Sequence, residues 1–528
     1  MAFYLGLDSS TQSLTAIVIE VDTDARGVVF EHAFRFDDEF PDYGTTNGVF
    51  RGSDPREVWS SPLLWADALD RMMAIVSREA GIDLSQLAAI SGSGQQHGSV
   101  YLNGDAIARF GSLDPRQPLA RQIAGIFSRD RAPVWMDEST RAECNAIERA
   151  VGGTTALAQL TGSAATERFT GPQIRKFAQQ EPERYANTAR IHLVSSFLAS
   201  LLAGADAPLD PGDGAGTNLM DIHSRDWSPA AVDATAGDLA AKLPQLRPSW
   251  TVVGTLAPYW QERYGFPAAQ VVAWSGDNPC SLVGSGLVHE ESIAISLGTS
   301  DTVFALTRQP HIVPSGSHVF GSPTGDYMSL ICFKNGSLAR ERIRAEFHLD
   351  WTGFSRALDE TPPGNNGALM LPWFEPEITP RVDKPGIERR DLDPKAASAN
   401  VRAVVEGQVM AMANHAEPVT GGRARRVLAT GGASANRAIL HVIADAFNAT
   451  VFQLPGGNSA CLGAALRAYH AHAKSQGRDI PWVEIVRGFS EPLANTRIEP
   501  TAAHVAVYRD AREKYAAFER ETIARRRT

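Results

Sequence analysis

The sequence predicts an α/β protein made of two similar domains, each a sheet covered by helices. Three observations support this prediction. Strand-like apolar runs alternate with stretches of helical periodicity along the chain. A strand, a short Ser/Thr-rich turn and a returning strand occur near the N-terminus and again in the second half. Finally, 528 residues are too many for one ordinary hydrophobic core.

The first half begins with β-rich runs at residues 3–7 and 14–21, which small polar residues separate. Residues 56–80 carry apolar side chains at helical spacing, so a helix is expected there. The run "LAAISGSG", residues 87–94, then predicts another strand. Further on, "ADAPLDPGDGAGTNLMDI" at 205–222 is rich in Gly and Pro and is expected to be a loop.

The second half repeats this order. Residues 270–279, "QVVAWSGDNP", predict a strand that runs into a turn, and 292–306 predict a strand, a small polar turn and a second strand. The Pro and Gly residues within 255–270 suit a hinge region. We therefore expect one domain at 1–262 and a second at 263–528.

Composition excludes several classes of protein. The formal charge of −10 argues against a general nucleic-acid binder, and the densest basic cluster, Arg525–Arg527, is expected to be a solvated tail. The N-terminus lacks the features of a signal peptide, and no apolar run is long enough to span a membrane. The four cysteines form no Cys-x-x-Cys pair, which indicates reduced thiols in a cytoplasmic protein and no zinc site.

The common phosphate-binding motifs are missing. No G-x-x-x-x-G-K-[ST] occurs, and the glycines at 92, 94 and 98 do not have the dinucleotide spacing. Two Ser/Thr turns are better candidates, at Asp8–Ser13 and Gly298–Thr302, because exposed backbone N–H groups and hydroxyls can hold an anion. A carboxylate beside a phosphate also suggests a bridging Mg²⁺ ion. Each turn alone is better explained as an ordinary hairpin, but two such turns in corresponding halves favour a nucleotide site.

"LATGGASANRAIL" predicts a strand that runs into Gly431-Gly432 and a helix that begins at about Asn436. Paired glycines let a flat ligand or a phosphate approach the backbone closely. The alternative is a plain strand-to-helix turn with Ser434 as the N-cap.

"SGDNPC" places Asp277 and Asn278 at the end of a strand, and Pro279 suits the first turn of a helix. Open α/β sheets bind ligands at the carboxyl ends of their strands, and an Asp there can accept the proton of an attacking hydroxyl. The alternative is a helix start that an Asp or Asn side chain caps.

Gln95-Gln96-His97 places three hydrogen-bonding side chains at another strand end, which suits a polyhydroxylated ligand. For His97 alone, a buried and satisfied histidine is the default explanation in a chain with 13 histidines. Arg168, in "TERFTGPQ", suits a surface ion pair or a ligand contact, and its residue type does not decide between them.

Together these stretches resemble the FGGY family of carbohydrate kinases, and within it the branch of eukaryotic-type xylulose kinases. The resemblance covers nearly the whole chain. The matching stretches, in family order, are "GLDSSTQS", "SGSGQQHGS", "WMDESTRAECNAIE", "LTGSAATERFTG", "SGDNP", "ISLGTSDT", "CFKNGSL" and "LATGGASANR". The resemblance implies two actin-like (ribonuclease H-like) ATPase domains with an interdomain cleft. It also implies ATP-dependent phosphorylation of D-xylulose to D-xylulose 5-phosphate.

The resemblance further implies roles for individual residues. Asp277 would be the general base and Asp8 would help to hold Mg²⁺. The sugar would contact Gln96, His97, Arg168, Asp277 and Asn278. ATP would contact Thr11, Gly298, Thr299, Ser300, Trp351, Gly431, Gly432 and Asn436. The enzyme would act on small molecules in the cytoplasm, as a monomer or homodimer, with no nucleic-acid or membrane partner.

Three departures from the family pattern leave alternatives open. Ser10 stands where many members have Gly, Lys176–Gln179 lacks the usual Trp, and residues 368–380 lack a common Gly-Glu-Arg ending. A kinase for another ketose or polyol is the nearest alternative. The others are an actin-like ATPase switch without sugar transfer and an inactive sugar-binding regulator, although intact Asp8 and Asp277 argue against the last.

Overall fold

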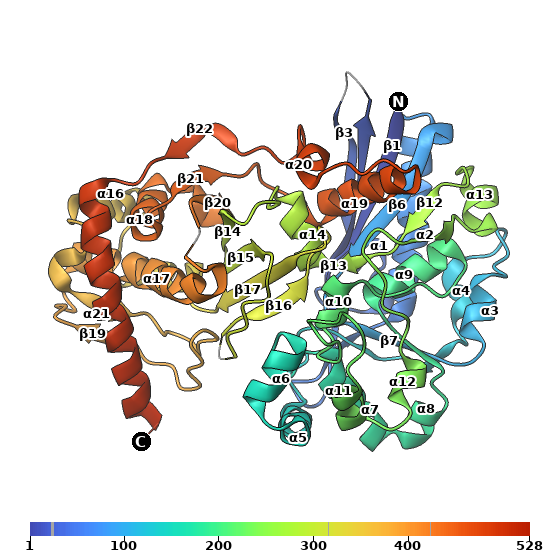
Figure 1. Ribbon diagram of the computed structural model, residues 1–528, viewed down its shortest axis with the longest axis horizontal. Helices are drawn as coiled ribbons and strands as arrows, with labels where there is room; N and C mark the ends of the chain where they lie inside the picture. Colours follow the sequence, from blue (N-terminus) through green and yellow to red (C-terminus); the bar gives the residue numbers. More distant parts are fainter. Residues whose placement is uncertain (23–25, 315, 423, 528) are drawn as a thin grey trace. The chain divides into compact units, whose positions relative to one another are not determined.

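A computed structural model describes residues 1–22, 26–314, 316–422 and 424–527 of the chain (Figure 1). These residues form two compact units. Unit 1 consists of the segments Met1–Val288, Val319–Met328 and Asn458–Ser490, and unit 2 of His289–His318, Ser329–Gly457 and Glu491–Thr528. Both are mixed α/β units, as the alternation of strands and helices in the sequence predicted.

The central sheet of unit 1 has the strand order β11-β12-β6-β1-β2-β3, and β13 also pairs with β6. β1 and β2 form an antiparallel hairpin, whereas β6 runs parallel to β1 and β13 runs parallel to β6. The strands are β1 (Ala2–Ser9), β2 (Ser13–Val21), β3 (Arg26–Arg35), β6 (Leu87–Gly94), β11 (Val252–Thr255), β12 (Gln270–Val272) and β13 (Ser275–Gly276).

Strand β1 is buried on both faces, which explains its continuous apolar run. Leu5 and Leu7 belong to the core that α2 (Pro62–Glu79) and α9 (Val194–Ala203) complete on one face. On the other face Tyr4 packs with residues of α19 (Ser459–Ser475), the orange-red helix that lies beside β1 and β6 in Figure 1. Gly6 permits this close approach, because a Cβ there would lie 2.2 Å from the Cys461 carbonyl oxygen.

The rest of unit 1 surrounds this sheet. A small sheet with the order β10-β7-β8 and a group of short helices follow β6 along the chain. These elements are β7 (Ser99–Leu102), β8 (Phe127–Arg129), α5 (Arg141–Val151), α6 (Thr154–Thr161), α7 (Thr170–Gln180), β10 (Arg190–Leu193), α10 (Pro211–Ala215), α11 (Pro229–Thr235), α13 (Pro258–Tyr264) and α14 (Asp277–Gly284).

Unit 2 repeats the plan of the first sheet. Its strands follow the order β17-β15-β14-β20-β21-β22, with β14 and β15 as an antiparallel hairpin and β20 parallel to β14. The elements are β14 (Ser292–Leu297), β15 (Asp301–Thr307), β17 (Tyr327–Phe333), α15 (Ser337–Glu346), α16 (Trp351–Glu360), α17 (Ala397–Thr420), β20 (Arg426–Thr430), α18 (Arg437–Phe447), β21 (Thr450–Gln453), β22 (Leu493–Ile498) and α21 (Ala502–Arg527).

The compact units do not divide the chain at 262/263. The segment 255–270, expected as a hinge, lies within unit 1, where α13 buries Tyr259 and Trp260. Unit 1 continues to Val288 and also takes in Asn458–Ser490, because α19 covers one face of its sheet.

The basic cluster Arg525–Arg527 was expected as a solvated tail; the Arg525 side chain is indeed 64% exposed, but the cluster is part of a helix. The C-terminal residues continue helix α21, and the guanidinium groups of Arg525 and Arg526 each lie 2.9 Å from the Glu388 carboxylate. Among the residues that the structure describes, no helix is both long and apolar enough to cross a membrane.

Candidate functional site

In unit 1, three parallel strands bring the predicted site residues to one edge of the sheet. Asp8 of β1 lies opposite Ser93 of β6, and Gly94 of β6 lies opposite Gly276 of β13. Residues 95–97 follow β6 directly and Asp277 follows β13 directly. The carboxyl ends of parallel strands meet at the same edge, so these side chains gather there.

Asp277 is the first residue of α14, and Pro279 follows in the first turn as predicted. The helix has no side-chain cap, so the alternative of an Asp- or Asn-capped start was wrong. The Oδ1 atom of Asp277 accepts hydrogen bonds from the backbone N–H of Asn278 at 2.8 Å and from its Nδ2 at 3.0 Å. Burial, together with the nearby negative charge of Asp8, raises the pKa of Asp277 to about 7.

Asp8 is half-buried at the end of β1. The hydroxyl of Ser93 donates to its Oδ1 at 2.6 Å. Burial raises the pKa of Asp8 to about 6, although the bond from Ser93 acts in the opposite direction. Two adjacent carboxylates with raised pKa values form an environment that favours a cation or a proton.

Gln96 and His97 are buried side chains that backbone carbonyls orient. The Oε1 atom of Gln96 accepts from Asn278 Nδ2 at 2.9 Å, and its Nε2 donates to the Gly212 carbonyl at 3.5 Å. The Nδ1 atom of His97 lies 2.8 Å from the Gly216 carbonyl, which can only accept, so Nδ1 carries a hydrogen. The ring of Phe169 stacks on His97 with 4.3 Å between centroids.

Thr11 and Arg168 are less tightly held. Thr11 lies in the β1–β2 turn, where its hydroxyl accepts a hydrogen bond from Trp135 Nε1 at 2.7 Å and donates to Gln95 Oε1 at 3.4 Å. Arg168 is half-buried beside Phe169, and the described part of the chain offers its guanidinium no hydrogen bond or ion pair.

In unit 2, the turn Gly298-Thr299-Ser300 joins β14 to β15, and Thr299 and Ser300 are exposed. The residues before α15 pack directly against this turn. The Ser337 backbone N–H donates to the Gly298 carbonyl at 2.8 Å, and a Cβ at Gly336 would lie 2.7 Å from the same oxygen. These contacts hold the turn in place, while Thr299 and Ser300 stay exposed.

Directly after the turn, a buried ion pair holds Asp301 at the start of β15. The Arg340 guanidinium donates to both oxygens of Asp301, at 2.9 and 3.1 Å, and also to Gln408 Oε1 at 2.8 Å. Burial raises the pKa of Asp301, and the arginine opposes that shift.

Gly431 comes directly after β20, which runs parallel to β14, so it lies beside the same turn. It has φ of +85°, and a Cβ there would lie 2.6 Å from the Leu297 carbonyl oxygen. Only glycine fits this position without displacement. Gly432 has no such neighbour: a Cβ there would meet nothing within 4 Å.

Asn436 is the N-cap of α18, and its Oδ1 accepts from the N–H of Ala438 at 3.0 Å. The alternative with Ser434 as the N-cap was therefore wrong. Asn436 Nδ2 donates to Ser355 Oγ at 2.8 Å, and Ser355 Oγ donates to the Trp351 carbonyl. This chain of bonds joins α18 to the start of α16, where the Trp351 side chain is 46% exposed, a high value for a large aromatic ring.

The carboxylates of unit 1 fit Mg²⁺ rather than a metal that needs an all-protein cage. Among the described residues, no group of three or more His, Cys, Asp or Glu side chains could hold a metal ion. Mg²⁺ needs only one or two carboxylates, because phosphates and water supply the remaining oxygens.

Several contributors were not predicted from the sequence. Ser93, Trp135 and Phe169 contact Asp8, Thr11 and His97, and residues 210–216 supply the carbonyls that orient Gln96 and His97. The unusual glycine density of 210–216 was the one available signal, and it indicated only a loop.

Comparison with known proteins gives two family matches. Residues 130–284 match the model of the FGGY family of carbohydrate kinases, N-terminal domain, and residues 293–472 match that of the C-terminal domain.

Relatives of known name match nearly the whole chain. A xylulose kinase from Mus musculus is 42% identical over 98% of this chain and 94% of its own. Xylulose kinase 2 from Arabidopsis thaliana is 40% identical, with 94% and 90% covered.

Solved structures share the fold. A kinase from Brucella ovis, titled a xyloylose kinase, has a TM-score of 0.82 at 24% identity over 99% of both chains. Plasmodium falciparum glycerol kinase with ADP has a TM-score of 0.78 at 15% identity over 98% of both chains.

Proposed function

The chain belongs to the FGGY family of carbohydrate kinases, and from this premise we propose that it transfers the γ-phosphoryl group of ATP to the terminal hydroxyl of D-xylulose, giving D-xylulose 5-phosphate. The names of its relatives, at 40–43% identity, support this sugar as the acceptor. The observation that carries the chemistry is Asp277, a carboxylate at a strand end whose pKa of about 7 suits a proton acceptor.

Asp277 takes the proton of the attacking sugar hydroxyl in this proposal. A base with a pKa near the working pH is ionised in a large fraction of molecules and still binds a proton well. Two hydrogen bonds from Asn278 hold the carboxylate in place. Gln96, His97 and Asn278 bind the remaining hydroxyls of the sugar, because each offers donors or acceptors at a fixed position, and the guanidinium of Arg168 supplies further donors.

ATP is bound through backbone and small side chains. The hydroxyls of Thr11, Thr299 and Ser300 and the backbone of the turn at Gly298 would contact phosphate oxygens, as anion-binding turns do. Gly431, Gly432, Asn436 and the exposed ring of Trp351 would bind the adenosine part, since an indole offers a stacking face.

Asp8 would hold the metal ion that accompanies ATP, and we propose Mg²⁺. When bound, Mg²⁺ would neutralise charge on the transferring phosphoryl group. The protein would act in the cytoplasm on small molecules, as a monomer or homodimer and without a nucleic-acid partner.

ADP release from MgATP tests the proposal, with a panel of ketopentoses, ketohexoses and polyols. Stimulation by D-xylulose, and its loss in Asp277→Asn, is the expected result. Stimulation by another sugar alone would keep the mechanism and change the substrate. ATP hydrolysis that no sugar stimulates would instead indicate an ATPase switch, and sugar binding without turnover would indicate a regulator.

A further inference from the structure

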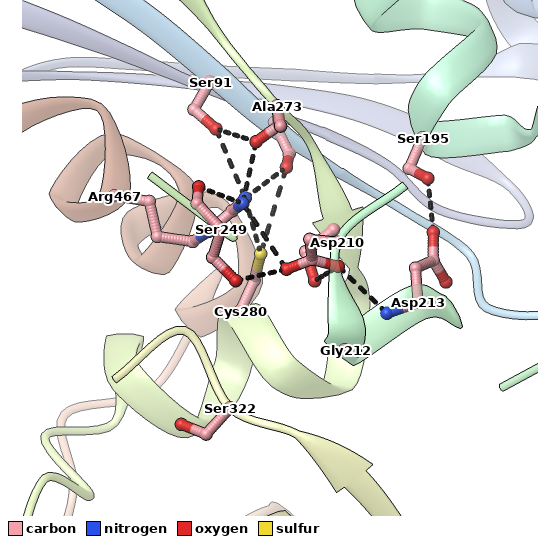
Figure 2. A network of polar contacts seen from close by, with 12 residues as sticks. Ser91, Ser195, Asp210, Gly212, Asp213, Ser249, Ala273, Cys280, Ser322 and Arg467 are labelled. Carbon is pink, nitrogen blue, oxygen red and sulfur yellow. Dashed lines mark hydrogen bonds and ion pairs between the residues drawn. The ribbon is translucent and has the colours of Figure 1, made fainter. Parts of the chain in front are cut away.

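One buried guanidinium, that of Arg467 in α19, contacts β6, α14 and the segment just before β13, which carry or lead into Gln96, His97, Asp277 and Asn278 (Figure 2). Its NH1 donates to the Gly92 carbonyl at 3.1 Å and to Ser91 Oγ at 3.2 Å, both in β6, and lies 3.6 Å from Cys280 Sγ in α14. Its NH2 donates to the Ala273 carbonyl at 2.7 Å, just before β13.

The partner of Arg467 in this interior is Asp210. The two side chains are 1% and 0% exposed, with 3.7 Å between NH2 and Oδ2. Asp210 Oδ2 accepts from Ser249 Oγ at 2.6 Å, and Oδ1 accepts from Ser275 Oγ at 2.8 Å. Ser275 stands two residues before Asp277, so this carboxylate connects to the strand that carries the base.

Asp210 also fixes the segment that orients Gln96 and His97. As the N-cap of α10, its Oδ1 accepts from the Asp213 N–H at 2.9 Å. The carbonyls of Gly212 and Gly216, at the two ends of this short helix, are the acceptors for Gln96 and His97.

We propose that Arg467 and Asp210 are positioning residues for sugar phosphorylation, which set the places of Asp277, Gln96 and His97 without contacting the substrate. The inference rests on the proposed function. A planar guanidinium with several donors holds β6, α14 and the backbone just before β13 in one arrangement, and a point charge does not. The carboxylate keeps α10 in register with β13 through Ser275.

This role differs from simple support of the fold. A supporting pair raises the free energy of unfolding and leaves the kinetics of folded molecules unchanged. A positioning pair changes sugar kinetics in molecules that remain folded, because a displacement of about 1 Å at a reacting group reduces the rate by about 100-fold. The residues of unit 2 that are proposed to bind ATP do not contact Arg467 or Asp210. An unchanged KM for ATP therefore distinguishes a positioning role from general support of the fold.

The test measures kcat and KM for sugar and for ATP, with a melting curve for each protein. Arg467→Lys keeps the positive charge but loses the planar guanidinium with its several N–H donors. Asp210→Asn keeps the size of the side chain but loses its negative charge, and Ser275→Ala removes a single hydrogen bond. We expect kcat/KM for the sugar to fall by about 10- to 100-fold in the first two. In Ser275→Ala we expect a fall of about 10-fold, because one hydrogen bond to the Asp210 carboxylate is lost. The KM for ATP should stay within about twofold of wild type.

Arg402→Lys is the matched control, because Arg402 forms a buried pair with Glu406 at 2.8 Å within unit 2, at none of the proposed site residues. It should lower the melting temperature and leave both kinetic constants unchanged. Positioning is overturned if Ser275→Ala and the folded Arg467 and Asp210 variants keep wild-type sugar kinetics, or if sugar and ATP constants change alike. A wild-type protein that no sugar stimulates overturns the proposed function itself, and this inference with it.

Discussion

Replacing Asp277 by Asn should abolish turnover and at the same time stabilise the protein, in the absence of metal and nucleotide. The folded protein holds a proton on Asp277 up to a pH of about 7, whereas the ordinary value is 3.8. Between these values the folded state binds more protons than the unfolded state, so stability falls as the pH rises through this range and levels off above it. The Asp277→Asn variant has no carboxylate to ionise at this position, so its stability does not fall with pH for this reason.

The magnitude follows from the size of the shift. A difference of about three pKa units corresponds to about 4 kcal/mol at a pH well above both values, at about 1.4 kcal/mol per unit. The part of that difference that develops between about pH 5 and about pH 8 is about 2.5 kcal/mol. The Asn side chain can still accept the hydrogen bond that the Asn278 N–H donates.

Urea unfolding of the metal-free protein at these two pH values measures the effect. We expect Asp277→Asn to gain stability over wild type, and the gain to grow with pH. Asp233→Asn is the control, at an exposed position of α11, and should change stability by less than about 0.5 kcal/mol. A variant that is no more stable than wild type at the higher pH, or a gain that is independent of pH, would refute the reasoning.

Three further predictions follow from the geometry. Gly431→Ala should raise the KM for ATP and destabilise unit 2 by about 1–3 kcal/mol, because its Cβ would collide with the Leu297 carbonyl; an unchanged melting curve and KM would contradict this. Gly463→Ala should destabilise unit 1 by a similar amount, about 1–3 kcal/mol, because its Cβ would lie 1.9 Å from the Cys280 carbonyl oxygen. Calorimetry measures this loss, and a variant that melts like wild type would contradict the prediction. Trp351→Ala should raise the KM for ATP about 3- to 10-fold, the loss of one stacking contact, and leave the KM for sugar and the melting temperature unchanged; an unaltered KM for ATP would exclude the ring from the nucleotide site.

Local patterns predicted the strands and the turns of both sheets. The run at residues 87–94 is β6, and the two Ser/Thr turns do join antiparallel strands. These features depend on alternation, apolar runs and turn residues that lie within a few positions of one another, so a single stretch of sequence contains the information.

Features that depend on distant pairing were not predictable in this way. Nothing in the sequence around Arg467 shows that its guanidinium meets Asp210, more than 250 residues earlier. The caps of α14 and α18 were left open between alternatives, because neighbouring Ser, Asp and Asn residues are all suitable caps and only the backbone path selects among them. Site residues inferred from the resemblance lie at strand ends, turns and helix starts, and their roles stay predictions.

The late segment Asn458–Ser490 has a consequence for synthesis. Unit 1 begins at the first residue but lacks α19 until about 475 residues have left the ribosome, so Tyr4 and Ile19 lose their apolar partners for most of translation. At about 5–20 residues per second, that interval is tens of seconds. Unit 1 therefore completes its core only after most of unit 2 has been made. A nascent chain of this kind exposes the apolar face of its sheet to chaperones or to other chains. Release of fragments that end before α19 would favour aggregation.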